Sequence, residues 1–153
     1  MIQRDRHLKI CMALIAANLC FIWGNSLLPA EASQALSDWV KSFLHGMFTS
    51  EEPAEAGSGL LRKIAHFAEF TSLGLLLSHL LTQLGKKHRY ALPLGFLAAC
   101  IDETIQVFVP GRGPGLLDVA IDTCGVLTGM ILLRLGYALW KQKQPKQYGG
   151  KSI

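Results

Sequence analysis

Ionisable and amide side chains recur at helical spacing inside three apolar stretches of this 153-residue chain. Within each stretch they lie three or four positions apart, on one helix face: His66 and Glu69; Asp102, Glu103 and Gln106; Asp118 and Asp122. A charged side chain at the centre of a membrane span costs roughly 2.5–3.5 kcal/mol, so such residues normally face a cavity or pair with one another. We therefore interpret the group, together with Arg112, as a ligand or substrate site. The alternative is a structural network in which Arg112 and His66 neutralise the acids.

Arg112 indicates anion binding. It lies between two glycines, Gly111 and Gly113, shortly before the predicted start of a helix near Leu116. Glycines let backbone N–H groups approach a ligand, and a helix N-terminus carries partial positive charge. Because arginine binds phosphate well, the sequence predicts that Arg112 holds a phosphate head group. The alternative is that Asp118, near the same helix start, merely complements the helix dipole.

Two further chemistries fit the same residues. His66, Glu69 and the other acids offer donor atoms that suit a divalent metal. No tight ligand motif such as His-Glu-x-x-His is present. The sequence therefore assigns no metal ligands, and a divalent metal is the only cofactor that we consider. A histidine–carboxylate pair also suits general acid–base catalysis, for which the candidates are His66, Glu69, Asp102 and Glu103. No serine or cysteine stands out as a nucleophile.

The composition indicates a membrane protein. Half of the residues are hydrophobic, 17% are charged and the mean hydropathy is +0.31, whereas soluble domains carry about 25% charge. A bilayer core of roughly 30 Å needs roughly 20 helical residues. The apolar runs predict one all-α domain, residues 1–153, built as a bundle of four transmembrane helices: residues 10–28, 64–84, 90–109 and 116–136. Nothing in the sequence resembles a nucleic-acid-binding module, so we expect no nucleic-acid partner.

The first apolar run has a rival interpretation. A basic start, an apolar run and the string Ala30-Glu31-Ala32 imitate a signal peptide with its cleavage site. The run is longer than the core of a signal peptide, which is typically about 7–15 residues. It also contains the polar residues Asn18 and Asn25. A retained transmembrane helix is therefore the favoured interpretation.

A shorter apolar stripe lies between the first and second predicted spans. Its members recur at steps of three and four residues: Leu36, Trp39, Val40, Phe43, Leu44, Met47 and Phe48. This spacing predicts an amphipathic helix over residues 33–48, with Ser33 as its N-cap. We expect the helix to lie in the membrane interface, and a lid packed on the protein is the alternative. A basic tail, residues 141–153, ends the chain.

Charge predicts the orientation in the membrane. Basic residues precede the first span, fill the loop at 86–89 and occupy the tail, whereas the other two loops are acidic or nearly uncharged. The positive-inside rule then places both termini in the cytoplasm and the loops at 29–61 and 110–115 outside. The short loop at 110–115 makes the third and fourth spans antiparallel neighbours. With this orientation the ionisable residues of the predicted site gather in one layer near the outer leaflet.

Three strings in these segments resemble the VanZ-like family. They are Lys63-Ile-Ala-His66-Phe-Ala-Glu69-Phe70, Asp102-Glu103-Thr-Ile-Gln106-Val-Phe-Val-Pro-Gly-Arg112 and Asp118-Val-Ala-Ile-Asp122-Thr-Cys-Gly125, with a looser likeness at Trp23-Gly-Asn-Ser26. The resemblance covers most of residues 20–130. It implies a small bacterial inner-membrane protein with several helices, in a family whose founding member is associated with resistance to the glycopeptide teicoplanin. The motif residues that it carries over are His66, Glu69, Asp102, Glu103, Gln106, Arg112, Asp118 and Asp122.

Three functions follow from these observations. The favoured one is a binding or accessory protein of the bacterial inner membrane, which recognises an anionic envelope lipid or a lipid-linked precursor. Membrane lipids would be its partners, and Arg112 its anion clamp. The second is an enzyme that acts on a lipid phosphate by general acid–base or metal-assisted hydrolysis. The third is a structural membrane protein whose polar network only holds the helices together.

Overall fold

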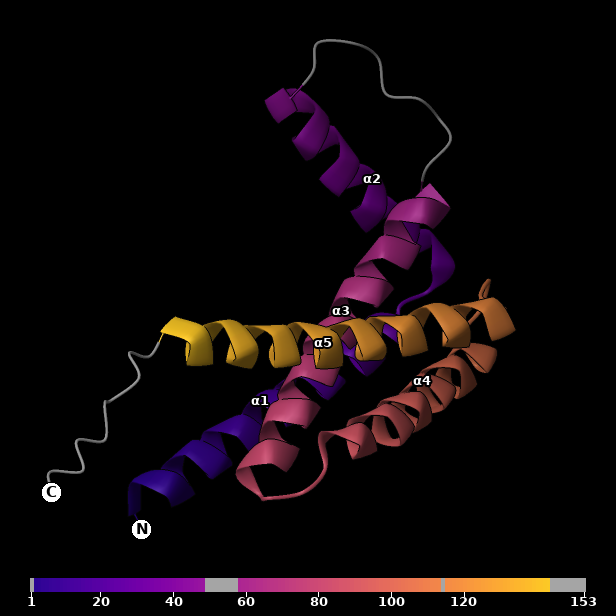
Figure 1. The fold of residues 1–153 in the computed structure, drawn as a ribbon. Helices are drawn as coiled ribbons and strands as arrows, with labels where there is room; N and C mark the ends of the chain where they lie inside the picture. The colour runs from indigo at the N-terminus through magenta and orange to yellow at the C-terminus, as the bar shows by residue number, and fades with distance from the viewer. Residues whose placement is uncertain (1, 49–57, 114, 144–153) are drawn as a thin grey trace, which may run out of the picture.

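Every regular element in the described part of the chain is helical. A computed structural model describes residues 2–48, 58–113 and 115–143. The helices run in the order shown in Figure 1: α1 (Ile2–Ser26), α2 (Ala30–Phe48), α3 (Ser58–Gln83), the short 3₁₀ helix η1 (His88–Tyr90), α4 (Ala91–Val107) and α5 (Leu116–Lys143). The structure therefore confirms the all-α class predicted from the sequence.

Three of the helices are long and apolar enough to cross a membrane. The segments that meet this criterion are Gln3–Ser26 in α1, Leu60–Gln83 in α3 and Leu116–Lys143 in α5. The helix α4 has 17 residues and is about 25 Å long at about 1.5 Å per residue, slightly less than the hydrocarbon core of roughly 30 Å. Its membrane crossing, predicted over 90–109, stays a prediction. Large apolar side chains lie exposed on the outside of the helices, as at Phe21, Leu97 and Leu135, which suits a protein solvated by lipid.

Three helix ends extend beyond the predicted spans, whereas α1 ends at Ser26 rather than at residue 28 and α4 is shorter than the predicted 90–109. The helices α1 and α3 begin at residues 2 and 58 rather than 10 and 64, and α5 continues to Lys143 rather than ending near 136. Polar residues occupy each extension. Helical hydrogen bonding continues through them once an apolar run has nucleated the helix, so hydropathy alone underestimates helix length. The basic tail therefore begins inside α5, and residues 144–153 lie outside the described chain.

The helix α3 is the centre of the bundle and contacts α1, α2, α4 and α5. In Figure 1, α5 crosses α3, and α1 runs beside α3 in the opposite direction. Two glycines of α5, spaced by four as is typical of close helix packing, permit this crossing. A Cβ atom at Gly125 would lie 2.6 Å from the Phe67 carbonyl oxygen, and one at Gly129 would overlap the Thr71 carbonyl oxygen. The motif thus serves contacts within the chain.

The helix α2 extends away from the other helices at the end of the bundle where α3 begins (Figure 1). It starts at Ala30, directly after Pro29, so the predicted N-cap at Ser33 is wrong and Ser33 lies in the first turn. The rings of Trp39 and Phe43 stack with centroids 5.9 Å apart and are mostly exposed. Exposed stacked aromatics suit contact with a membrane surface, but the interfacial position of α2 stays a prediction.

Candidate functional site

Four helix ends meet at the predicted site. The end of α1, the first turns of α3, the last turns of α4 and the start of α5 all contribute side chains that hydrogen-bond or face one another. A turn at 108–111 follows α4, and the ends of α4 and α5 lie close together. Gly111 in this turn has φ +75°, a left-handed conformation that a residue with a side chain rarely adopts. A Cβ there would also lie 3.1 Å from the Ala30 Cβ.

Gln106 is the centre of the hydrogen-bond network. Its side-chain oxygen accepts a 2.6 Å hydrogen bond from Nη2 of Arg62 on α3. Its amide nitrogen lies 2.8 Å from Asp102 Oδ2, 3.1 Å from Glu103 Oε1 and 3.5 Å from Ser26 Oγ. Gln106 is 1% exposed. One buried amide therefore connects α1, α3 and α4.

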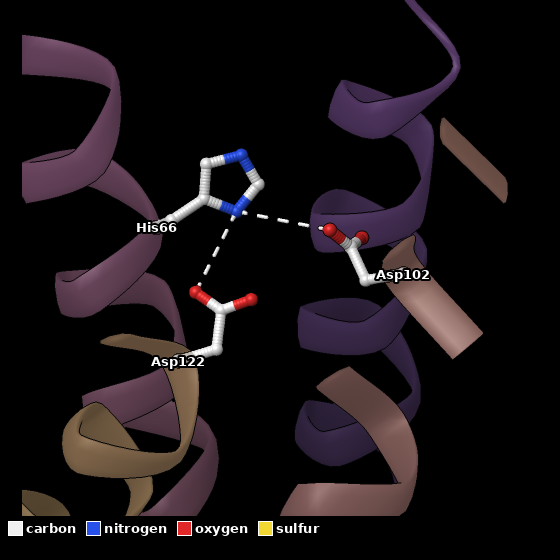
Figure 2. A group of neighbouring side chains, drawn as sticks. All are labelled: His66, Asp102 and Asp122. Atoms are coloured by element: carbon white, nitrogen blue, oxygen red, sulfur yellow. Dashed lines mark ion pairs between the residues drawn. The ribbon is translucent and has the colours of Figure 1, made fainter. Parts of the chain in front are cut away.

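His66, Asp102 and Asp122 converge from α3, α4 and α5 (Figure 2). The His66 Nδ1 atom lies 3.8 Å from Asp102 Oδ2 and 3.9 Å from Asp122 Oδ1. Both separations exceed hydrogen-bond length. All three side chains are buried, with relative exposures of 8%, 0% and 1%. The structure thus brings together an imidazole and two carboxylates that do not satisfy one another.

A cavity of about 110 Å³ opens beside this cluster. Every residue that lines it is charged or polar: Arg62, Lys63, His66, Glu103, Gln106, Asp118 and Asp122. A single water needs roughly 10–15 Å³, so the cavity has room for a small polar group or for an ion with its waters. Its lining holds no serine, threonine or cysteine in the described part of the chain.

Glu103 connects the cavity to the turn. Its Oε2 atom accepts a 2.7 Å hydrogen bond from the Gly115 backbone N–H, directly before α5 begins at Leu116. The positive end of the α5 dipole also stabilises a carboxylate in this position. Asp118 lies half-buried in the first turn of α5, so it suits the same dipole role while its side chain lines the cavity.

Glu69 and Arg112 belong to a second group, next to α1. Glu69 Oε1 accepts a 3.2 Å hydrogen bond from Asn25 Nδ2, and Arg112 Nη2 donates one of 3.1 Å to the Asn25 carbonyl oxygen. Glu69 lines an open groove of about 430 Å³ between α1 and α3. Arg112 is 9% exposed and is not part of the cavity wall. Burial lowers the pKa of its guanidinium from the ordinary value.

The structure therefore divides the eight predicted site residues. Five line the cavity, namely His66, Glu103, Gln106, Asp118 and Asp122, while Asp102 lies buried against them. Glu69 and Arg112 lie on the α1 side, so the predicted single pocket with Arg112 as its anion clamp is not the arrangement observed. The cations at the cavity are instead Arg62 and Lys63.

Sequence reasoning did not include Arg62, Lys63, Asn25 or Ser26 among the site residues. Arg62 precedes His66 by four positions, which is the spacing of side chains on one helix face. Asn25 and Ser26 are polar residues at the end of an apolar run. Both signals were present, but the predicted spans placed Arg62 and Lys63 in a loop, ahead of the second helix.

The comparisons with known proteins agree with the sequence resemblance. No curated protein and no solved structure gives a match. The family model described as VanZ/LLP1 matches residues 10–139, a range that holds all of α2, α3 and α4, most of α1 and α5, and every residue of the site. With its three apolar helices, the match supports a multi-pass membrane protein. The chain belongs to the VanZ/LLP1 family.

Proposed function

We propose that the cavity binds the phosphate of an anionic envelope lipid, or of a lipid-linked precursor, at the outer leaflet of the bacterial inner membrane. The observation that carries this proposal is a polar cavity, beside the ends of apolar helices, whose wall includes Arg62 and Lys63. Arginine and lysine are the side chains that most often bind phosphate in proteins. Only a ligand with a charged head group and an apolar body would use both features of the chain.

The two cations differ in their surroundings. Arg62 is half-buried and its Nη2 is held by Gln106. A guanidinium has five N–H donors, so donors remain for a ligand. Lys63 is exposed at the same helix start. An exposed ammonium beside a fixed guanidinium suits a phosphate that enters the cavity from the membrane surface.

The orientation in this proposal comes from charge. Basic residues before the first span, at 86–89 and in the tail favour cytoplasmic termini. The cavity lies at the opposite end of the helices from the 86–89 loop, and so at the outer leaflet. The family resemblance extends the proposal to a link with glycopeptide antibiotic resistance.

A purely structural network is the main competitor, and part of the polar group does have that character. The hydrogen bonds from Asn25 to Glu69 Oε1 and from Gly115 to Glu103 join helices, although Glu69 Oε2 is buried without a partner in the described chain. In contrast, both Asp122 oxygens and Asp102 Oδ1 are buried without a hydrogen-bond partner in the described chain. A network that only stabilised the fold would leave no such carboxylates at a cavity, because each costs about 1–3 kcal/mol or more when unsatisfied.

The substitution Lys63→Gln tests the proposal. The purified full chain in detergent should gain thermal stability from phosphatidylglycerol and gain little from diacylglycerol, which lacks phosphate. We expect Lys63→Gln to weaken phosphatidylglycerol binding about tenfold, because one charge-assisted hydrogen bond contributes about 1.5–3 kcal/mol and 1.4 kcal/mol is tenfold in affinity. The measurement is the melting temperature as a function of lipid concentration.

Lys86→Gln is the matched control, because Lys86 is also exposed but lies beyond the far end of α3. It should keep the affinity of the unmodified chain. Equal losses in the two variants would mean that general surface charge attracts the lipid. That result, or an equal response to diacylglycerol, would contradict the proposed site.

A further inference from the structure

Three buried side chains beside the cavity form a set of potential metal ligands. His66, Asp102 and Asp122 each offer one ligand atom, and these atoms all lie within 4.8 Å of one another. Figure 2 shows the His66 Nδ1 atom facing a carboxylate oxygen of each aspartate. Since each residue comes from a different helix, the folded bundle brings the three together.

The charge balance at this point favours a cation. Both Asp122 oxygens and Asp102 Oδ1 are buried and unpartnered, whereas Asp102 Oδ2 accepts a hydrogen bond from Gln106. Isolated buried carboxylates are strongly unfavourable unless they pair or bind a metal. In the described part of the chain, His66 is the one ionisable basic side chain within 4 Å of these two carboxylates. A neutral imidazole offers the remaining ligand that a divalent cation needs.

The distances suit a first-row ion. Zinc binds nitrogen and carboxylate oxygen at about 2.0–2.2 Å, which places tetrahedral ligand atoms about 3.4 Å apart. The two separations from His66 Nδ1, 3.8 and 3.9 Å, exceed this spacing by a few tenths of an ångström, and the ligand oxygens of the two aspartates lie within 4.8 Å of each other. Imidazole favours zinc and its neighbours, and carboxylates also accept Mn²⁺.

The surroundings also suit a metal. Gln106 Nε2 donates a 2.8 Å hydrogen bond to Asp102 Oδ2, and such partners orient metal ligands in proteins. His66 and Asp122 line the cavity. Three protein ligands leave at least one coordination position for a water or a ligand oxygen, and here that position would face the cavity.

We propose that His66, Asp102 and Asp122 bind one divalent first-row ion, Zn²⁺ or Mn²⁺, with an open coordination position toward the cavity. The site differs from the lipid proposal in its residues, and it does not depend on that proposal. Where both hold, the ion offsets the acids of the cavity wall and attracts the phosphate that Arg62 and Lys63 bind.

The first test is metal content in the absence of lipid. The full chain, without a histidine tag, is purified in detergent, stripped with EDTA and reloaded with Zn²⁺ or Mn²⁺. We expect about one ion per chain and a higher melting temperature. Asp122→Asn should weaken binding at least about 100-fold, since even loss of an outer partner costs about 10–100-fold in affinity.

Asp118→Asn is the matched control, because Asp118 lines the same cavity but is not one of the three proposed ligands. It should keep the ion. The Lys63→Gln variant should also keep the ion, so the metal proposal and the lipid proposal can fail independently of each other. Native-level binding by folded Asp122→Asn would overturn the proposal, and so would the absence of a stoichiometric ion in the unmodified chain.

A second measurement does not depend on any variant folding. Mn²⁺ bound to the unmodified chain should show, by pulsed electron paramagnetic resonance, coupling to a ¹⁴N nucleus from the single imidazole ligand. The observation of bound Mn²⁺ with oxygen ligands only would place the ion elsewhere and overturn the assignment.

Discussion

Replacing Gly129 with leucine is expected to prevent the chain from folding into a stable bundle. A Cβ at this position would overlap the Thr71 carbonyl oxygen and lie 2.6 Å from the Leu75 backbone nitrogen. Both atoms belong to the backbone of α3, so no side-chain rotation relieves the overlap and the helices must separate. Overpacking of a close contact costs about 1–3 kcal/mol and more where backbone is involved, so we expect a loss of about 3 kcal/mol or more in the free energy of unfolding.

The control for this experiment is Gly136→Leu on the same helix. Nothing lies within 4 Å of a Cβ at Gly136, and removal of a mid-helix glycine favours the helix by about 0.5–1 kcal/mol. Size-exclusion profiles and melting temperatures in detergent give the comparison. A Gly129→Leu variant as stable as Gly136→Leu would show that α3 and α5 do not cross as closely as described.

The substitution Gln106→Leu should have the second-largest effect. It introduces an apolar side chain of similar size and removes every hydrogen bond that joins Arg62, Asp102 and Glu103 through the amide. Each buried group left unsatisfied costs about 1–3 kcal/mol. We therefore expect a loss of about 3 kcal/mol, seen as a fall in melting temperature on the order of 10 °C.

Thr104→Val on the same helix is the matched control for Gln106→Leu. Thr104 is exposed, and its hydroxyl donates a hydrogen bond to the Cys100 carbonyl oxygen within α4. Its replacement should change the melting temperature little, since surface changes usually stay within about 0.5 kcal/mol. Equal effects at positions 104 and 106 would contradict the central place given to Gln106.

Apolar periodicity was enough to predict most of the architecture. Runs of apolar residues indicated the helices, and the polar positions within them indicated where three helix ends would meet. The network around Gln106 and the cluster of His66, Asp102 and Asp122 lie where these helix ends meet. Membrane helices are favourable for such reasoning, because a buried charge in an apolar run must have a reason to be there.

The sequence did not predict that Glu69 and Arg112 lie apart from the residues that line the cavity. Side chains three positions apart, such as His66 and Glu69, point about 60° apart around a helix. That angle is enough to turn Glu69 toward Asn25 on α1 while His66 faces α4 and α5. Arg112 lies in a turn, where periodicity carries no information on direction. Arg62 was not counted among the site residues, because α3 begins six residues before the predicted span.

The central claim is that α4 crosses the membrane and that the polar cavity at its C-terminal end lies at the outer face. The most direct test is to measure on which side of the membrane the two ends of α4 lie. Single cysteines replace Gly113, exposed in the turn before α5, and Lys86, exposed beyond the end of α3, in a chain whose native cysteines are changed to alanine. On intact cells, a membrane-impermeant maleimide should label the cysteine at 113 at once and the cysteine at 86 only after permeabilisation. Labelling of both from the same side would mean that α4 does not cross, and labelling of 86 alone from outside would place the cavity at the cytoplasmic face.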